Sequence, residues 1–477
     1  MTVHLGELFR RNAEVVPGAV AAAMGGRRIT HAELDDAANR VAARLRALGV
    51  GRGDRIVCWM KSGLDVLPIF AAATKLGAVF APLSTSLGPD EALPFVRHAR
   101  PALVVAERPI EGADAPFEPP AALLAAPPAR DVVCAGARDG DPHVLFFTSG
   151  STGRPKGVIV SHRANHLRTY QGVFRDDAEH SVCMFPLFHM AAYTLALSAW
   201  QTGGSITFAG AGAAELLDAV VAARANRLYG IPAVWARILE LLDREPGARD
   251  LSSLCAVDTG TSATPVELLR ALKERFPWAR ARVYYGSTEA GACTALADAD
   301  LLARPGSVGR PVAGVRVRVS AGGELEVKSP LLFDGYFDDA DATAAAFDDG
   351  WYRTGDRAAI DGDGYVSIVG RLTDLIRTGG EAVAPAEVEA VLRAHPAIAD
   401  VAVVGVPDPR WGEIVCAVAV ADPGAPRPDL DELQGFCAAR LAGFKKPRRL
   451  EWTAALPRTA ATGQVQRALI VQQLLAR

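Results

Sequence analysis

A run of small and hydroxyl residues around one lysine is the part of the chain best suited to phosphate chemistry. Residues 145–162 read LFFTSGSTGRPKGVIVSH, where an apolar strand is followed by three glycines, by Lys156 and, before that lysine, by four hydroxyl residues. Glycines let a backbone approach a ligand and present N–H donors, hydroxyls add donors, and lysine supplies a point charge. The stretch favours a polyphosphate ligand, with a flexible Gly/Ser loop as the alternative. Its candidate residues are Thr148, Ser149, Gly150, Ser151, Thr152, Gly153 and Lys156.

Carboxylates in two other stretches could complete such a site. In YYGSTEAG an apolar strand ends in a turn that displays Thr288 and Glu289. A carboxylate beside a hydroxyl could hold Mg²⁺, a hard cation that needs oxygen ligands, although a solvated glutamate is the simpler interpretation of the residues alone. In WYRTGD, Asp356 follows a tight turn and could accept two ribose hydroxyls, although a turn aspartate is usually a cap.

The N-terminal part of the chain alternates helical and strand patterns, which would carry these residues. In residues 30–54, Leu34, Val41, Leu45 and Leu48 share one helical face, Thr30 and Glu33 form a capping box, and Gly49 is a plausible stop. The segments DRIVCWM and AVFAPL then predict strands, and LDVLPIFAAATKLG predicts the helix between them. Such alternation indicates parallel sheets covered by helices.

The pattern changes twice further along the chain. From about Val308, GVRVRVS, GELEVKS and GYVSIVG indicate short strands and tight turns, typical of a small antiparallel barrel-like unit. From Arg371 onward, helix and strand patterns return over about a hundred residues, enough for a separate α+β domain. We therefore predict two domains, residues 1–370 and residues 371–477.

The bulk composition excludes several classes of partner. The formal charge of −3, from 51 basic and 54 acidic residues, gives no general attraction to nucleic acid or anionic lipid. No window reaches the roughly 18 apolar residues of a membrane helix, and the N-terminus lacks a signal-peptide pattern, so we expect a cytoplasmic protein. The seven cysteines are scattered and never spaced as CxxC, which predicts buried thiols rather than disulfides or a zinc site.

Taken together, these blocks resemble the adenylate-forming superfamily of acyl-CoA synthetases, nonribosomal-peptide adenylation domains and luciferases. LFFTSGSTGRPKG resembles the phosphate loop of that family, and further blocks follow in the family's order over essentially the whole chain. These blocks are ITHAELDDAANRVAARLRALGVGRGDRI, AAATKLGAVFAPL, PLFHMAAY, YYGSTEAG, GWYRTGD, GRLTDLIRTGGEAVAPAEVE and GFKKPRR. The resemblance is most like an acyl- or aryl-CoA ligase. It implies an α/β fold with a large N-terminal domain of two αβ sheets plus the barrel-like unit, and a smaller, mobile α+β C-terminal domain.

The resemblance also implies roles for particular residues. Glu289 would be the Mg²⁺ ligand, Thr288 would contact the α-phosphate, Asp356 the ribose, and Arg371 the nucleotide near the domain boundary. Tyr285 and Gly286 would complete the nucleotide site with the phosphate loop. Without the resemblance, Arg371 would be an ordinary surface arginine.

The implied substrates are ATP with Mg²⁺, a small carboxylic acid, and coenzyme A as the thiol acceptor. The acid would lie against five residues, namely His189, Met190, Gly260, Tyr285 and Gly291; a lone histidine among apolar residues is otherwise more often structural. No acidic or basic residue occurs in PLFHMAAY, which favours a neutral acyl or aryl tail. Coenzyme A would contact the glycine turn and basic run formed by Gly379, Gly380, Glu381, Lys445 and Lys446. A carrier-protein phosphopantetheine could use the same route.

Residue 464 departs from the family pattern. In related proteins a lysine after the C-terminal glycine bridges the carboxylate and the α-phosphate, whereas PRTAATGQ has an extra residue and then Gln464. Loss of a preorganised charged donor commonly costs roughly 3–4 kcal/mol in the transition state, although glutamine still donates a neutral hydrogen bond. The residue two after Arg371, where the family's C-terminal domain pivots, is Thr373 instead of the usual Asp or Lys.

Three interpretations of Gln464 remain open from the sequence. In the first, the protein is a ligase with slow adenylation, helped by Arg458 or Arg467. In the second, it acts on acyl-AMP or passes its activated group to a carrier protein, an amine or another acceptor. In the third, it binds nucleotide and acid with little turnover.

Overall fold

The computed structural model describes residues 4–132, 134, 136–149, 155–170, 178–378, 381–438, 440–459 and 463–476. By their internal contacts the residues form two compact units. Unit 1 comprises Met1–Pro305, Pro311–Arg316 and Lys328–Tyr352, and unit 2 comprises Gly306–Arg310, Val317–Val327 and Arg353–Arg477. The predicted domain boundary at residue 371 is a different division of the chain, and it stays a prediction.

A nine-stranded sheet has the order β15-β14-β13-β12-β11-β9-β10-β1-β2, and it combines the first two strands of the chain with strands from residue 180 onward. Its strands are β1 (Val20–Met24), β2 (Arg27–Thr30), β9 (His180–Cys183), β10 (Ser205–Phe208), β11 (Arg227–Tyr229), β12 (Ala256–Gly260), β13 (Arg280–Ser287), β14 (Gly291–Leu296) and β15 (Arg310–Pro311). Strands β9, β11, β12 and β13 are parallel neighbours. Their carboxyl ends therefore meet at one edge, where parallel α/β sheets bind ligands.

A seven-stranded sheet in unit 1 has the order β18-β8-β7-β4-β3-β5-β6. Its strands are β3 (Arg55–Trp59), β4 (Val79–Pro82), β5 (Leu103–Ala106), β6 (Phe117–Glu118), β7 (Pro142–Ser149), β8 (Pro155–Ser161) and β18 (Gly335–Tyr336). Strands β7 and β8 form an antiparallel hairpin, and β18 pairs antiparallel with β8. This hairpin supports the predicted phosphate loop.

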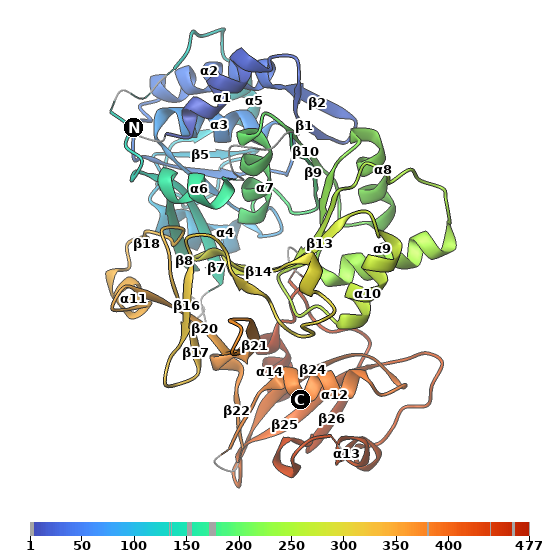
Figure 1. Cartoon of the computed structure of the whole chain (residues 1–477). Helices are drawn as coiled ribbons and strands as arrows, with labels where there is room; N and C mark the ends of the chain where they lie inside the picture. Colours follow the sequence, from blue (N-terminus) through green and yellow to red (C-terminus); the bar gives the residue numbers. More distant parts are fainter. Residues whose placement is uncertain are drawn as a thin grey trace. The chain divides into compact units, whose positions relative to one another are not determined.

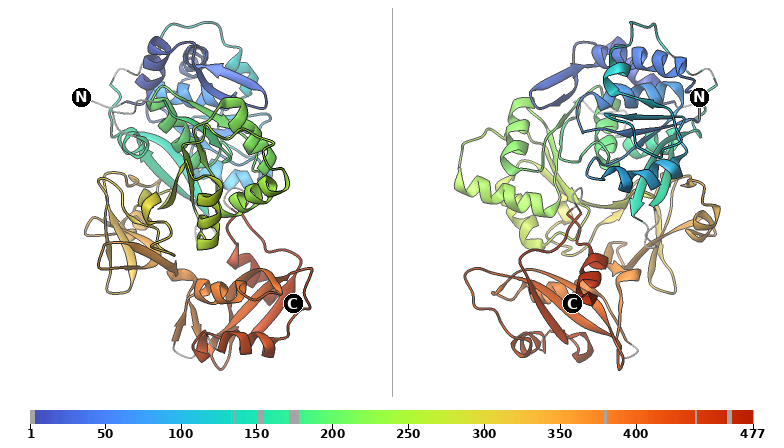
Figure 2. Two further views of the ribbon diagram at one scale, coloured as in Figure 1. Left: turned by 45° about the vertical axis from the view of Figure 1, so that its right-hand side comes forward. Right: turned by 180° about the vertical axis from the view of Figure 1, so that it is seen from behind.

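Helices cover both sheets (Figures 1 and 2). They are α1 (Gly6–Val15), α2 (His31–Ala47), α3 (Val66–Leu76), α4 (Pro89–Ala99), α5 (Pro120–Leu124), α6 (His162–Thr169), α7 (Met190–Gln201), α8 (Ala213–Ala223), α9 (Pro232–Arg244), α10 (Val266–Arg275) and α11 (Ala340–Ala345). Helix α2 begins at the predicted capping box, where Thr30 accepts from the Glu33 N–H and the Glu33 side chain accepts from the Thr30 N–H. Leu34, Val41 and Leu45 are buried on its inner face, as the periodicity predicted.

The predicted barrel-like unit is a five-stranded sheet. It has the order β16-β17-β20-β19, with β21 also paired with β20. Its strands are β16 (Arg316–Val319), β17 (Glu324–Lys328), β19 (Phe347–Asp348), β20 (Trp351–Ile360) and β21 (Val366–Arg371). The boundary between the two compact units passes through this sheet.

The C-terminal sheet of unit 2 has the order β23-β22-β25-β24, with β26 paired with β25. Its elements are β22 (Ile376–Thr378), β23 (Glu381–Val383), α12 (Pro385–Arg393), β24 (Ile398–Asp408), β25 (Gly412–Ala421), α13 (Leu430–Ala438), β26 (Arg449–Thr453) and α14 (Arg467–Leu475). Along β24, Val401 and Val403 belong to a core cluster with residues of α12 and α13, whereas Val404 belongs to a second cluster with Ile470 of α14. Side chains alternate between the faces of a strand, so both faces of this sheet are buried.

The predicted fold class is confirmed by these sheets and helices, whereas the cysteine prediction is only partly right. Five of the seven thiols are buried, but Cys134 is partly exposed and Cys255 is exposed. All seven are free. Within the described ranges, none of the helices has the length and apolar character required to traverse a bilayer.

Candidate active site

Lys156 lies on the hairpin that carries the predicted phosphate loop. It is the partner of Thr148 across the β7–β8 ladder, and its Nζ is 4.9 Å from the centre of the Tyr336 ring. Gly157 permits this arrangement, because a Cβ there would lie 2.8 Å from a Leu145 methyl carbon and 3.3 Å from the Phe337 Cβ. The predicted loop residues Gly150, Ser151, Thr152 and Gly153 lie outside the described residues.

Glu289 lies beside the same tyrosine. The Tyr336 hydroxyl donates to the Glu289 Oε1 at 3.3 Å, and the Phe333 N–H donates to the Glu289 carbonyl at 2.7 Å. Burial, together with the nearby Glu289 carboxylate, raises the pKa of Tyr336, so the phenol stays protonated and remains a donor. Lys156, Tyr336 and Glu289 thus form a row of cation, ring and carboxylate.

The chemistry of this row fits a magnesium ion held with phosphate oxygens. Oε2 of Glu289 has no hydrogen-bond partner within the described parts of the chain, so one carboxylate oxygen is available as a ligand. Those same parts contain no group of three His, Cys, Asp or Glu side chains able to hold a metal by themselves. Because Mg²⁺ is commonly bound by one or two carboxylates plus substrate phosphates, a single glutamate is a suitable protein contribution.

Close backbone contact fixes the turn that presents Thr288 and Glu289. A Cβ on Gly286 would lie 2.0 Å from the Gly291 carbonyl oxygen, so only glycine fits where β13 meets β14. The Ser287 hydroxyl accepts from the Ala290 N–H at 3.1 Å and tightens the turn. Tyr285, also predicted at the site, lies on β13 opposite Thr294 and is partly exposed.

Arg168 of α6 contacts this turn, and no sequence pattern had indicated it. Its guanidinium donates to three main-chain carbonyls, those of Thr288 at 2.9 Å, Glu289 at 2.7 Å and Leu331 at 2.6 Å. It also lies 3.6 Å from the Met190 sulfur. Gly291, which was predicted to face the acid, leaves room for this side chain, since a Cβ there would lie 3.1 Å from the Arg168 Cγ.

His189 and Met190 begin helix α7. The His189 Nδ1 accepts from the Ala191 N–H at 3.2 Å and caps the helix, which leaves the ring proton on Nε2. Burial lowers the pKa of His189 to about 4, so the ring is neutral at pH 7. The ring stacks on Phe185 with centroids 5.2 Å apart, and Met190 is buried. The histidine therefore has both a structural role and a donor atom.

Gly260, also predicted at the acid site, lies under a tyrosine. A Cβ on Gly260 would lie 2.5 Å from the Tyr229 hydroxyl. The ring of Tyr229 is 5.7 Å from Phe185 and 6.5 Å from Tyr284, centroid to centroid. Together with His189 these rings form an aromatic wall at the carboxyl edge of β9, β11, β12 and β13.

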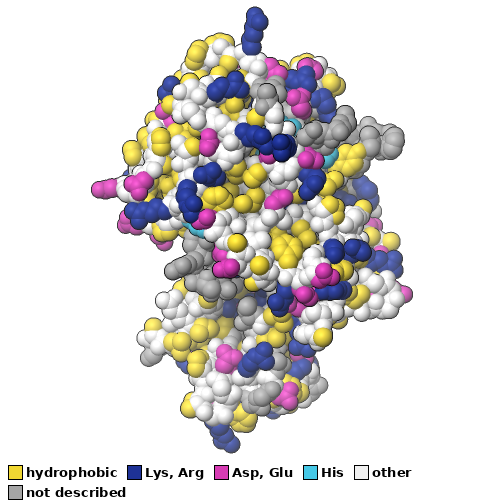
Figure 3. Space-filling view, turned by 90° about the vertical axis from the view of Figure 1, so that its left-hand side faces the viewer, with side chains coloured by type: hydrophobic (Ala, Val, Ile, Leu, Met, Phe, Trp, Pro, Cys, Tyr) yellow, Lys and Arg dark blue, Asp and Glu magenta, His cyan; other side chains and the backbone are white. Residues whose placement is uncertain are grey.

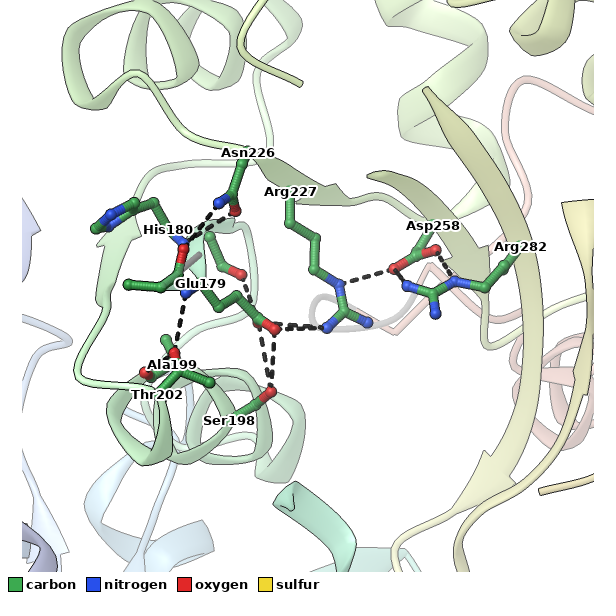
Figure 4. Close-up of polar contacts among 11 residues, drawn as sticks. Glu179, His180, Ser198, Ala199, Thr202, Asn226, Arg227, Asp258 and Arg282 are labelled. Carbon is green, nitrogen blue, oxygen red and sulfur yellow. Dashed lines mark hydrogen bonds and ion pairs between the residues drawn. The ribbon is translucent and has the colours of Figure 1, made fainter. Parts of the chain in front are cut away.

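A buried row of alternating charges lies next to this wall, and sequence patterns missed it (Figure 4). The Arg227 side chain is 3.2 Å from Glu179 and 2.7 Å from Asp258, and Asp258 is also 3.0 Å from Arg282. The Glu179 carboxylate accepts further bonds from the Ser181 and Ser198 hydroxyls. Two carboxylates and two guanidiniums cancel in charge, which is how buried ions are tolerated.

In unit 2 the predicted ribose and nucleotide residues form an ion pair. Asp356 and Arg371 are partners across the β20–β21 ladder, and the Arg371 Nε is 2.9 Å from an Asp356 oxygen. Arg371 also donates to the Thr354 carbonyl at 3.1 Å. The tight turn predicted before Asp356 is absent, because Gly355 and Asp356 both lie inside β20; Gly355, with φ of +74°, donates its N–H to Glu324 at 2.9 Å. The two residues predicted from separate motifs thus lie together.

Gln464 is exposed, and its main chain is hydrogen-bonded to Thr459. The Thr459 N–H donates to the Gln464 carbonyl at 2.8 Å, and the Gln464 N–H donates to the Thr459 hydroxyl at 3.1 Å. Arg458 donates to the Gly463 carbonyl at 2.7 Å and lies 2.6 Å from Asp400. Arg467 lies 2.6 Å from Glu389 and 3.4 Å from Asp374. Both arginines are therefore engaged elsewhere, which argues against the expectation that either would stand in for the missing lysine.

The residues predicted to contact coenzyme A lie apart along unit 2. Gly379 and Gly380 are outside the described residues, and Glu381 is exposed opposite Thr378 in the β22–β23 ladder. Lys445 pairs with Glu387, whereas Lys446 has no side-chain partner within the described ranges. Two neighbouring cations are also engaged, Arg448 over the Trp411 ring at 4.1 Å and Arg449 with Glu451 at 2.8 Å.

The surface charge agrees with small-molecule substrates. On the face that Figure 3 presents, basic and acidic side chains are interspersed rather than separated by sign, in keeping with the near-balanced formal charge of −3.

Comparison with known proteins places the whole chain among one group of relatives. Residues 9–337 match the family described as AMP-binding enzyme, and residues 387–462 match the AMP-binding enzyme C-terminal domain. A feruloyl-CoA synthase of Amycolatopsis is 35% identical over 97% of this chain and 98% of its own length. The long-chain fatty acid–CoA ligase FadD13 of Mycobacterium tuberculosis is 31% identical over 99% of both chains.

Solved structures show the same similarity. ATP-bound MatB from Rhodopseudomonas palustris superposes with a TM-score of 0.86 at 28% identity and covers 99% of both chains. The anthranilate–CoA ligase AuaEII, in complex with anthranoyl-AMP, gives a TM-score of 0.88 at 25% identity over 100% of this chain and 98% of its own.

Proposed function

Because the chain belongs to the AMP-binding enzyme family, we propose that it is a carboxylic acid–CoA ligase whose adenylation step is slow. It is an AMP-forming acid–thiol ligase that uses ATP, Mg²⁺ and coenzyme A. In the first half-reaction a carboxylate oxygen bonds to the α-phosphorus of ATP, and the bond from that phosphorus to pyrophosphate breaks. In the second, a thiol sulfur attacks the acyl carbon, AMP leaves, and the thiol proton is released.

The observation that carries this proposal is the row of Lys156, Tyr336 and Glu289. Adenylyl transfer of this kind needs positioning and cations more than it needs a protein nucleophile. Lys156 supplies one fixed positive charge, held 4.9 Å from the Tyr336 ring centre. Glu289, oriented by the Tyr336 hydroxyl, would hold Mg²⁺, which neutralises charge on phosphate oxygens. Thr288 offers a hydroxyl on the same turn.

The slow first step follows from Gln464. An amide donates a neutral hydrogen bond where a lysine would bring a charge, and charge-assisted bonds are about twice as strong. Arg458 and Arg467 are engaged with carboxylates and cannot replace that charge without breaking those ion pairs. A missing charged donor commonly lowers a rate by about two to three powers of ten.

The acid we propose carries a neutral acyl or aryl tail. The aromatic wall of His189, Phe185, Tyr229 and Tyr284 offers apolar faces, and the neighbouring charges are paired with one another. A second carboxylate on the substrate would need a cation taken from Asp258 or Glu179. The names of the relatives mention different acids, and they do not single one out.

We propose coenzyme A as the acceptor, with a carrier-protein phosphopantetheine as the second candidate. Lys446, which has no side-chain partner within the described part of unit 2, is the cation most available for a CoA phosphate. Between the half-reactions, residues 371–477 would rotate as a mobile domain relative to residues 1–370, with the pivot at Thr373. A pivot needs only backbone dihedral change, which threonine allows.

An acid-library screen of pyrophosphate exchange, run with and without coenzyme A, tests substrate and acceptor together. Supplying synthetic acyl-AMP with coenzyme A should bypass the slow step and give thioester at an ordinary rate. If no thioester forms from acyl-AMP, the CoA-ligase proposal is wrong, and amine or carrier-protein acceptors become the alternative. If neither ATP nor acyl-AMP is consumed with any acid, the protein binds these ligands without turnover.

A further inference from the structure

Arg168 occupies an unusual position for an arginine. Its guanidinium contacts no carboxylate within ion-pair distance among the described residues; its partners are the carbonyls of Thr288, Glu289 and Leu331 and the Met190 sulfur. These partners belong to three separate parts of unit 1, namely the β13–β14 turn, the segment before β18, and the start of α7. We propose that Arg168 is a positioning residue that holds the β13–β14 turn and the start of helix α7 in a fixed position relative to each other.

The hydrogen bonds to the turn determine which way its peptide groups face. In a trans peptide unit the N–H points away from the C=O, and the described residues contain no cis peptide. When Arg168 holds the Thr288 carbonyl, the N–H of Glu289 therefore points to the opposite side of the turn. That N–H donates to no group in the described parts of the chain, so it is available to an anionic oxygen.

The charge of Arg168 adds to this effect. An arginine guanidinium is a cation at neutral pH. Neutral carbonyls satisfy its hydrogen bonds, and the Asp334 and Glu289 carboxylates act on it only from beyond ion-pair distance. A cation behind the turn therefore favours an anion in front of it.

The contact with Met190 extends the same support to the acid. Met190 is buried at the first position of α7, directly after the His189 cap, and its sulfur is 3.6 Å from the Arg168 Nη1. One side chain thus contacts both the turn that carries the Mg²⁺ ligand and the helix predicted to face the acid. Loss of Arg168 should disturb the binding of both substrates, which a purely local packing residue would not do. This inference rests on the proposed function only for the identity of the acid site.

The test compares three variants of the full chain. Arg168→Met keeps the apolar stem and removes every donor, whereas Arg168→Lys keeps the charge but not the planar fork that reaches three carbonyls. Arg163→Met is the matched control, because Arg163 is exposed on the same helix and its side chain makes no hydrogen bond to the described residues. Equilibrium binding of Mg·ATP, which needs no turnover, is measured beside kcat and the two KM values.

We expect Arg168→Met to weaken Mg·ATP binding about tenfold, raise the KM of the acid, and lower kcat about a hundredfold. Arg168→Lys should recover most of the Mg·ATP affinity but little of kcat, and Arg163→Met should match the wild type. A folded Arg168→Met with unchanged Mg·ATP affinity and unchanged KM values overturns the inference, even if kcat falls. If Arg168→Met does not fold, Arg168→Lys provides the test. A wild-type kcat in Arg168→Lys would contradict the inference that the planar guanidinium is needed.

Failure of the proposed function gives a different result. A wild-type protein that consumes neither ATP nor acyl-AMP would contradict the ligase proposal. Weaker Mg·ATP binding by Arg168→Met would still support the role of Arg168 in positioning the β13–β14 turn.

Discussion

We expect residue 464 to limit the rate of the proposed first half-reaction. We expect Gln464→Lys to raise pyrophosphate release at least tenfold, because it restores a charged donor to a loop whose two nearby arginines are engaged. Single-turnover release of pyrophosphate with saturating acid is the measurement. Gln473→Lys, on the exposed side of α14, adds the same charge elsewhere and should change nothing. An equal rate in Gln464→Lys and wild type would mean that the loop with its extra residue does not reach the phosphate.

Tyr336 offers a separate test of the magnesium ligand. Tyr336→Phe removes the hydroxyl that donates to Glu289 but keeps the ring beside Lys156. A hydrogen bond of this kind contributes about 0.5–1.5 kcal/mol, so the Mg²⁺ concentration for half-maximal activity should rise about two- to tenfold. A Mg²⁺ titration of pyrophosphate release measures it. Tyr170→Phe, at an exposed position, is the control, and a Mg²⁺ dependence unaltered by Tyr336→Phe would contradict the role given to this hydroxyl.

At the scale of elements, the β13–β14 turn depends on the absence of one side chain. Gly286→Ala would place a Cβ 2.0 Å from the Gly291 carbonyl oxygen, so the two strands must separate or the turn must move. We expect a loss of about 1–3 kcal/mol in the free energy of unfolding and a larger loss of activity, since Thr288 and Glu289 move with the turn. Urea unfolding and pyrophosphate release measure the two effects.

Gly18→Ala is the matched control for that substitution. A Cβ at residue 18 would meet no atom within 4 Å, so both stability and activity should stay near the wild-type values. Equal behaviour of the two alanine variants would show that the turn adjusts freely, contrary to its close packing.

Local patterns predicted the elements well, because each such signal lies within a few neighbouring residues. The Thr30–Glu33 capping box and the buried face of α2 are examples, since both follow from spacing along one helix. The pairing of Asp356 with Arg371 needed the β20–β21 ladder, which brings together residues fifteen positions apart. Arg168 carried no signal, because its acceptors are backbone atoms more than a hundred residues away.

The row of Glu179, Arg227, Asp258 and Arg282 was invisible to sequence patterns for the same reason. Each of these residues resembles an ordinary surface charge in its own segment, and only the order β9-β11-β12-β13 places them side by side. Burial of Cys58 or Cys183 could be predicted from apolar neighbours, whereas Cys255, which directly precedes the buried strand β12, is exposed despite such neighbours.

At the scale of the whole molecule, buried histidines should make stability fall in mild acid. His143 and His162 are fully buried with rings 4.5 Å apart, and His143 donates to the Thr74 hydroxyl while accepting from Asn165. Burial lowers the pKa of His143 to about 3 and that of His162 well below its usual value. Below about pH 6.5 the unfolded chain therefore binds protons that the folded chain does not.

The free energy of unfolding should therefore rise with pH over this range, because the unfolded state binds more protons than the folded state. Each of the two histidines should contribute a slope of up to about 1.4 kcal/mol per pH unit between roughly pH 6.5 and 5. Urea unfolding at pH 7, 6 and 5 measures the slope, and His143→Gln should reduce it. A free energy of unfolding that is flat over this range would contradict neutral burial of both rings.

The alternating charge row also constrains how related sequences can change. Asp258 pairs with two arginines, and Arg227 pairs with two carboxylates. Replacing any one of these four residues therefore leaves a charged side chain without one of its ion-pair partners. Divergence at these positions should therefore occur as paired exchanges, either of Glu179 with Arg227 or of Asp258 with Arg282, and rarely one residue at a time. Homologues that keep these four charges but differ in the aromatic wall would show that the charge row is a structural support. The preference for the acid would then change through the rings of the wall alone.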